Sequence, residues 1–129
     1  MEYNISEAEW EVMRTLWECG EPMTSAEIVA RVEDLRGRSP RTIKTLLQRL
    51  VAKGFVTFTI DAADSRVYHY SAAVSEDICV KRENHDFVSL YYKGDVAGML
   101  ARFIGDSELS RDQIEALTAL LAEKKEDAP

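Results

Sequence analysis

The sequence has no long apolar run and very little cysteine. No stretch approaches the roughly 18 consecutive apolar residues that a membrane-spanning helix needs. The first residues, MEYNISEAEWEV, are acidic, whereas a secretory signal begins with positive charge. We therefore expect a cytoplasmic protein with no membrane partner. Cys19 and Cys79 lie 60 positions apart without CxxC spacing, so we expect two buried or half-buried thiols rather than a disulfide framework or a metal cluster.

Catalytic signatures are also absent from the sequence. It contains no GxSxG, P-loop, GxGxxG or HExxH motif, and no carboxylate–histidine pair at useful spacing. We interpret His69 and His85 as surface or half-buried rings rather than metal ligands or general bases. The sequence therefore argues against an enzyme and predicts neither a cofactor nor a metal.

Negative charge dominates the chain overall but not locally. The net charge is −7, which by itself disfavours binding to nucleic acid. Residues 1–35 hold nine acidic and two basic side chains, and residues 67–129 hold twelve acidic and seven basic ones. Residues 36–66 hold seven basic and only two acidic side chains. Because a local field steers a surface toward phosphates more than the total charge does, this middle segment is the candidate nucleic-acid interface.

Caps and apolar spacing predict two helices before residue 37. The capping-box pairs Ser6–Glu9 and Thr24–Glu27 open them, and Gly20 breaks the first. Their apolar stripes are Trp10, Met13, Leu16 and Trp17 in the first helix, and Ile28, Val32 and Leu35 in the second.

A third helix is predicted after a turn at Gly37. Ser39 caps it, Pro40 takes its first position, where a missing N–H costs nothing, and Gly54 ends it. The apolar stripe of this helix is Ile43, Leu46, Leu47 and Leu50.

The sequence period then changes to that of strands. Residues 55–60 and 66–72 are rich in β-branched and aromatic side chains and flank the polar turn 61–65, which predicts a β-hairpin. Three helices followed by a hairpin are typical of a winged helix-turn-helix. The expected fold is mostly α with a small β-hairpin wing (α+β), with a DNA-binding domain over 1–73 and a helical dimerisation domain over 74–129.

Helical patterns return after residue 75. Helices are predicted over 76–92, over 95–104, and from the capping box of Ser110 and Gln113 onward. Three short helices with apolar stripes make a poor core alone, whereas docking on a second copy would bury the stripes, most commonly with twofold symmetry. The expected dimerisation residues are Met99, Leu100, Phe103, Ile114, Leu117 and Leu121.

The outer face of the third helix is basic and polar. Projected at about 100° per residue, this face carries Arg41, Thr45, Gln48 and Ala52, flanked by Thr42, Lys44 and Arg49. A helix that enters the major groove needs donors toward base edges and small residues that permit close approach. The alternative, an ordinary solvated face that happens to be cationic, is less favoured because an acidic helix precedes this one and a wing follows it.

Residues at the edges of this face are candidates for the DNA backbone. Ser39 lies at the helix N-terminus, where backbone N–H groups favour a phosphate. Lys53 and Arg66 are candidates for phosphate or minor-groove contact, with plain surface as the alternative. Asp61 and Asp64 argue against insertion of the wing tip itself.

Five segments in unbroken order resemble one known family. The segments ISEAEWEVM, SPRTIKTLLQRLVAKGF, YYKG, ARFIGDSELS and IEALTALL are similar to the penicillinase, methicillin-resistance and copper-responsive repressors (the BlaI/MecI/CopY family). The resemblance implies a transcriptional repressor that binds palindromic, double-stranded operator DNA as a homodimer until a signal releases it. Base-reading positions implied by the family are Thr42, Lys44 and Thr45. Implied phosphate contacts are Arg41, Arg49 and Lys53, to which we add Ser39, Gln48 and Arg66.

Two departures from the family concern the releasing signal. Antibiotic-responsive members are cleaved at an Asn-Phe bond, and the matching position here reads Arg102-Phe103. Copper-responsive members carry Cys-x-Cys motifs in the C-terminal tail, and this tail has no cysteine. We expect neither signal to act here. A sensor protease and a small-molecule inducer stay open as partners in release, and a noncovalent ligand is favoured.

Two other functions fit parts of the sequence. One is a regulator that senses a small molecule in a pocket between the domains, where Tyr68, Tyr70, Tyr91 and Tyr92 would gather. The other is a winged-helix protein-interaction module that never touches DNA, which the acidic net charge favours. The operator sequence and the regulated genes do not follow from the sequence.

Overall fold

A computed structural model describes residues 4–36 and 38–129, without the side chains of 33–36. Its contacts divide the chain into two compact units, Met1–Arg82 and Glu83–Pro129, which are described in turn. The turn expected at Gly37 and the side chain of Leu35 lie outside the described residues. Within the described part, no helix has the length and apolar character needed to cross a membrane.

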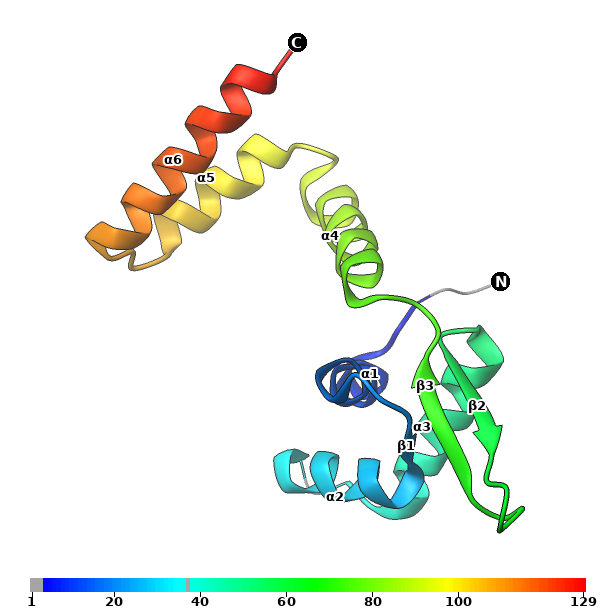
Figure 1. The fold of residues 1–129 in the computed structure, drawn as a ribbon. Coiled ribbons are helices and arrows are strands. Elements are labelled where there is room, and N and C mark those ends of the chain that lie inside the picture. The colour runs from blue at the N-terminus through cyan, green and yellow to red at the C-terminus, as the bar shows by residue number, and fades with distance from the viewer. Residues whose placement is uncertain (1–3, 37) are drawn as a thin grey trace. The chain divides into compact units, whose positions relative to one another are not determined.

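The first unit is a winged helix-turn-helix (Figure 1). Its elements are α1 (Glu7–Cys19), β1 (Met23–Thr24), α2 (Ser25–Arg36), α3 (Pro40–Lys53), β2 (Val56–Ile60) and β3 (Tyr68–Ala72). The predicted hairpin is confirmed, because β2 and β3 pair antiparallel with Phe58 opposite Tyr70. The sequence did not predict β1, which pairs with the other edge of β3 and completes a sheet of order β1-β3-β2.

The helices of this unit begin and end where local chemistry directs. The Ser6–Glu9 capping box is present, with the Glu9 amide donating to Ser6 Oγ at 3.1 Å. Ser39 caps α3 by accepting from the Thr42 amide at 3.2 Å. Gly54 ends α3 with φ of 86°, a left-handed conformation that costs glycine little and other residues more. Local signals thus set where α1 and α3 begin and where α3 ends.

A single core joins the three helices to the sheet. Ile43, Leu47 and Leu50 of α3 are fully buried, as are Val12 and Met13 of α1. The predicted stripe of α1 is largely confirmed, with Trp10 and Trp17 packing at the edge of the core rather than inside it. Burial of one face of α3 leaves its opposite face to the solvent.

The second unit consists of helices only. α4 (Glu76–Tyr92) begins in the first unit and ends in the second, and α5 (Val96–Asp106) and α6 (Arg111–Asp127) follow. Ser110 and Gln113 form the predicted capping box of α6. The structure describes α5 and α6 in full, and neither contains a buried residue. Their apolar stripes therefore lie open in the single chain.

Candidate nucleic-acid interface

The two faces of α3 differ sharply in exposure. The predicted apolar stripe is buried, with each of its four members at most 4% exposed. Every residue predicted on the outer face is exposed: Arg41, Thr42, Lys44, Thr45, Gln48, Arg49 and Ala52. Among the described residues, no ion pair engages Arg41, Lys44 or Arg49. The helix thus offers free cations and short polar side chains on one continuous surface.

The hydroxyls of the two threonines on this face are hydrogen-bonded to α3 or to its N-cap residue. The Thr42 hydroxyl lies 2.9 Å from Ser39 Oγ, and the Thr45 hydroxyl donates to the Arg41 carbonyl at 3.0 Å. Each bond restricts the χ1 angle of its threonine, so both side chains are oriented before any ligand arrives. Oriented groups lose less conformational entropy on binding.

A groove of about 640 Å³ runs between α3 and the wing. Lys44 and Gln48 of α3 line it together with Arg66 and Tyr68 of the hairpin. Thr24 at the end of β1 and the first two residues of α2 also line it. The structure therefore brings together residues that the sequence placed in separate candidate groups. Cations from two elements line one concave surface, which suits a polyanion.

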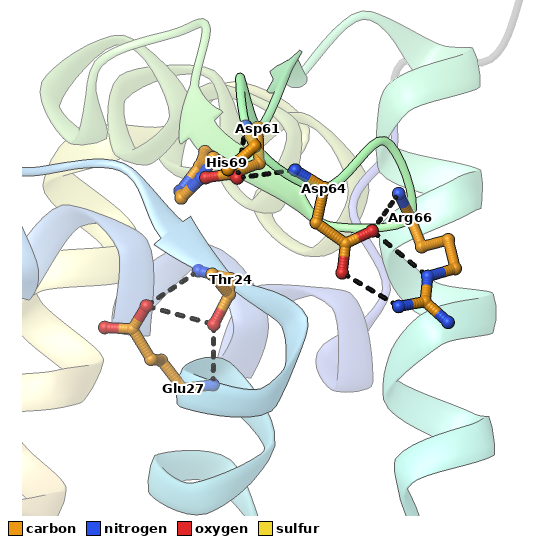
Figure 2. A network of polar contacts seen from close by, with 7 residues as sticks. Thr24, Glu27, Asp61, Asp64, Arg66 and His69 are labelled. Carbon is orange, nitrogen blue, oxygen red and sulfur yellow. Dashed lines mark hydrogen bonds and ion pairs between the residues drawn. The ribbon is translucent and has the colours of Figure 1, made fainter.

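The wing tip is organised by its own carboxylates (Figure 2). Asp61 accepts from the Ala63 and Asp64 amides, both at 3.0 Å, and from His69 Nε2 at 2.8 Å. The bond to His69, followed by those from the two amides, lowers the pKa of Asp61 below its usual range. These hydrogen bonds stabilise the turn of the wing, and all three partners of the Asp61 carboxylate lie within the hairpin.

Arg66 pairs with Asp64 on the same hairpin. Its guanidinium donates two hydrogen bonds to this carboxylate, at 3.0 and 3.1 Å, which lower the pKa of Asp64 (Figure 2). The Arg66 side chain is nevertheless 88% exposed. Because an exposed ion pair contributes little to stability, Arg66 can exchange its carboxylate for a phosphate at small cost.

Lys53 lies in a different environment from the one expected of a phosphate contact. Its ammonium donates to both carboxylate oxygens of Glu9, at 2.7 and 3.0 Å, and to the Asn4 carbonyl at 2.9 Å. Glu9 is 1% exposed. Burial alone would raise the pKa of Glu9, but the hydrogen bonds from Lys53 and Ser6 together lower it. Lys53 thus ties the end of α3 to the start of α1, and a phosphate would have to displace this pair.

The sequence did not predict the ion pair between Lys53 and Glu9, nor a second one between Arg38 and Glu11. Arg38, to which the sequence assigned no role, donates to Glu11 Oε2 at 2.9 Å from the residue before the Ser39 cap. Both pairs bind a basic residue at one end of α3 to α1. Neither pair has a local signal, because the partners lie 44 and 27 positions apart in the chain.

The cysteines and histidines lie as predicted. Cys19 is half-buried and Cys79 is buried, and burial raises the pKa of the Cys79 thiol. His69 is half-buried in the wing, and His85 is exposed.

Comparison with known proteins identifies the family. Residues 5–123 match the model of the penicillinase repressor family. The chain is 33% identical to the methicillin resistance regulatory protein MecI of Mammaliicoccus sciuri, over 95% of this chain and 96% of that one. It is 31% identical to the penicillinase repressor of Bacillus licheniformis, over 94% and 91% of the two chains.

Solved structures agree with this assignment. The DNA-binding domain of the repressor BlaI superposes with a TM-score of 0.50 at 32% identity, covering 57% of this chain and 84% of that domain. An S. aureus MepR mutant bound to an oligodeoxyribonucleotide shares the fold, with a TM-score of 0.54 at 19% identity over 95% of this chain and 78% of that one. The chain belongs to the penicillinase repressor family.

Proposed function

We propose that this chain is a transcriptional repressor that binds a palindromic operator as a homodimer, each copy reading one half-site with α3. The observation that carries the proposal is the outer face of α3, where free cations and two oriented threonines stand beside a groove lined by the wing. Of the relatives named above, one is a methicillin resistance regulatory protein and the other a penicillinase repressor, and one of the similar solved structures is the DNA-binding domain of a repressor.

Base reading is assigned to Thr42, Lys44 and Thr45, near the start of α3. In a major-groove complex the first turns of the recognition helix lie closest to the base edges. Ser39, Arg41, Gln48, Arg49 and Arg66 surround these three and are assigned to phosphates, which position a protein without specifying sequence. Lys53 is the exception, because its ammonium already neutralises Glu9.

The homodimer rests on the apolar stripes of the second unit. Leu100, Phe103, Ile114, Leu117 and Leu121 are between 39% and 60% exposed in the single chain. Apolar residues exposed in such numbers on two helices are typical of an interface. We assign residues from 74 onward to dimerisation, although the first turn of α4 packs on the first unit through Cys79.

Selection from a random duplex pool with the full chain, followed by fluorescence anisotropy, tests the proposal. We expect a palindromic consensus, with binding that weakens steeply as salt rises because cations on α3 displace counterions from phosphates. Lys124→Ala, which removes an exposed cation from α6, is the matched control for substitutions on α3. Enrichment of no sequence, or binding indifferent to salt, would instead favour the protein-interaction module.

A second candidate, a regulator that senses a small molecule, is favoured by a cavity in the second unit. This cavity of about 560 Å³ lies between α4 and α5 and has Phe87, Val88, Met99, Leu100 and Phe103 among its lining residues. The expected tyrosine cluster stays a prediction: Tyr68 and Tyr70 contact Phe58, whereas Tyr91 and Tyr92 contact Phe87.

Release by copper or by cleavage is not expected. One equivalent of Cu(I) should leave the protein–operator complex intact, because the tail lacks the thiolates that Cu(I) selects. Arg102, which pairs with Asp106 at 3.8 Å, replaces the expected asparagine at the cleavage position. Release by one equivalent of copper, or a cut between Arg102 and Phe103 in induced cells, would contradict this view.

A further inference from the structure

The connection between β3 and α4 is three residues long, and each residue is held by a different group. The Ala73 amide donates to the Phe55 carbonyl at 2.8 Å. The Val74 carbonyl accepts from the indole Nε1 of Trp17 at 3.0 Å. Ser75 accepts from the Ile78 amide at 3.3 Å through its hydroxyl and starts α4. Within the first unit, each residue of this connector therefore has a hydrogen-bond partner.

The first turn of α4 is also packed against the winged-helix core. Cys79 is 5% exposed and belongs to the core cluster, and Val74 packs against the same cluster. Trp17 also contacts Trp10, with the rings edge to face and their centroids 5.5 Å apart. The bond from Trp17 to Val74 joins an indole of α1 to the backbone just before α4.

The direction of α4 matters because this helix leads out of the winged-helix unit. Its 17 residues span about 25 Å at 1.5 Å per residue. A tilt of about 10° at its first turn would move its far end by about 4 Å, close to the 3.4 Å rise of one base pair. In a dimer built through the second unit, a tilt of this size at the connector would therefore be comparable to one base step.

We propose that Trp17 is a positioning residue that fixes the direction of α4 and thereby the half-site spacing that the dimer accepts. This inference rests on the proposed function, a homodimer on a palindrome. Trp17 contacts no DNA in this scheme, and its effect passes through the Val74 carbonyl. The expected signature is a change in spacing preference without a change in the reading of one half-site.

The test uses the full chain and a series of palindromes whose half-sites are moved together or apart by one or two base pairs. Trp17→Phe keeps an aromatic ring at this position but removes the N–H donor, leaving the Val74 carbonyl without its partner. Trp10→Phe is the control, since it alters the same ring pair without touching that bond. Affinity for each duplex and for a single half-site is measured by anisotropy.

We expect the parent and Trp10→Phe to bind one spacing more tightly than the others. In Trp17→Phe, the ratio of affinities between the preferred spacing and the others should fall about fivefold, while binding to a single half-site stays normal. Cys79→Ala, which thins the packing under the same turn, should flatten the profile in the same direction and covers the case in which Trp17→Phe folds poorly. A Trp17→Phe profile identical to the parent's, or a loss of half-site binding equal to the loss on the palindrome, would overturn the inference. Failure of the proposed function looks different, because the parent itself would then bind as a monomer or show no preference among the duplexes.

Discussion

The two units of this chain have helices with similar apolar stripes, but the stripe is buried in the first unit and exposed in the second. In the winged-helix unit, the stripe of α3 is at most 4% exposed and packs against α1 and the sheet. In the second unit, the stripes of α5 and α6, both described in full, contain no buried residue. The apolar spacing of a helix therefore predicts which face will be buried, but it does not show whether the surface that covers this face comes from the same chain or from another. Stability of the first unit should be a property of one molecule, and that of the second a property of protein concentration.

The largest expected effect separates these two kinds of core. Leu47→Ala removes a fully buried side chain and should lower the free energy of unfolding by about 2–5 kcal/mol, independently of protein concentration. Leu117→Ala should instead weaken self-association, with a loss that grows on dilution. Denaturant unfolding at two concentrations, with sedimentation, measures both. A concentration-independent loss in Leu117→Ala would place that residue in an internal core.

The boundary between the units is the next comparison. A fragment of residues 1–82 retains Val74 and Cys79, and we expect it to be a folded monomer that binds one half-site weakly. A fragment ending at residue 73 lacks both residues and the bond from Trp17 to the Val74 carbonyl, so it should unfold at lower denaturant. Sedimentation of the longer fragment as a dimer would remove the interface from the second unit.

Recognition by α3 gives a smaller effect that leaves the fold intact. Lys44→Ala and Thr45→Ala should each weaken operator binding by about 1–3 kcal/mol, because both side chains are exposed on the proposed reading face. Circular dichroism should match that of the parent, since neither residue belongs to the core. Unchanged anisotropy titrations in both variants would refute the assignment.

Substitutions of Arg66 and Lys53 should distinguish a contact with phosphate from an ion pair that stabilises the fold. Arg66→Gln should reduce the slope of log affinity against log salt by about 1, on operator and random DNA alike. Lys53→Gln leaves Glu9 buried without its cation and should lower the unfolding midpoint while leaving that slope unchanged. If Lys53→Gln instead reduced the salt slope and Arg66→Gln left it unchanged, the Glu9–Lys53 pair would have to open when the protein binds DNA.

The smallest expected effect is the pH dependence of Glu9. Because folding lowers the pKa of Glu9, its contribution to stability is present above its ordinary pKa of 4.5 and is lost as pH falls through the lower, folded value. The free energy of unfolding should therefore fall below about pH 4.5, and less steeply in Glu9→Gln than in the parent. Glu76→Gln, at the exposed start of α4, is the control and should follow the parent.

Most of the fold was predictable because its signals are local. The capping boxes of Ser6 and Ser110 and the left-handed glycines at 20 and 54 act within a few residues of where they stand. β1 was not predictable, because two residues carry no period and their pairing with His69 and Tyr70 is a long-range event. The candidate site divides in the same way. The exposed face of α3 follows from helical spacing, whereas the Lys53–Glu9 pair depends on how two helices pack.

The hydrogen bond from Thr45 to the Arg41 carbonyl has a consequence for the bases that this helix would read. A hydroxyl that donates its proton to its own helix keeps only lone pairs and a methyl group for a partner. Such a group suits the amino groups of adenine and cytosine or the methyl of thymine, and does not suit the acceptor edge of guanine. Lys44, which only donates, has the opposite preference. A half-site under this part of α3 should therefore place a guanine beside Lys44 and another base beneath Thr45.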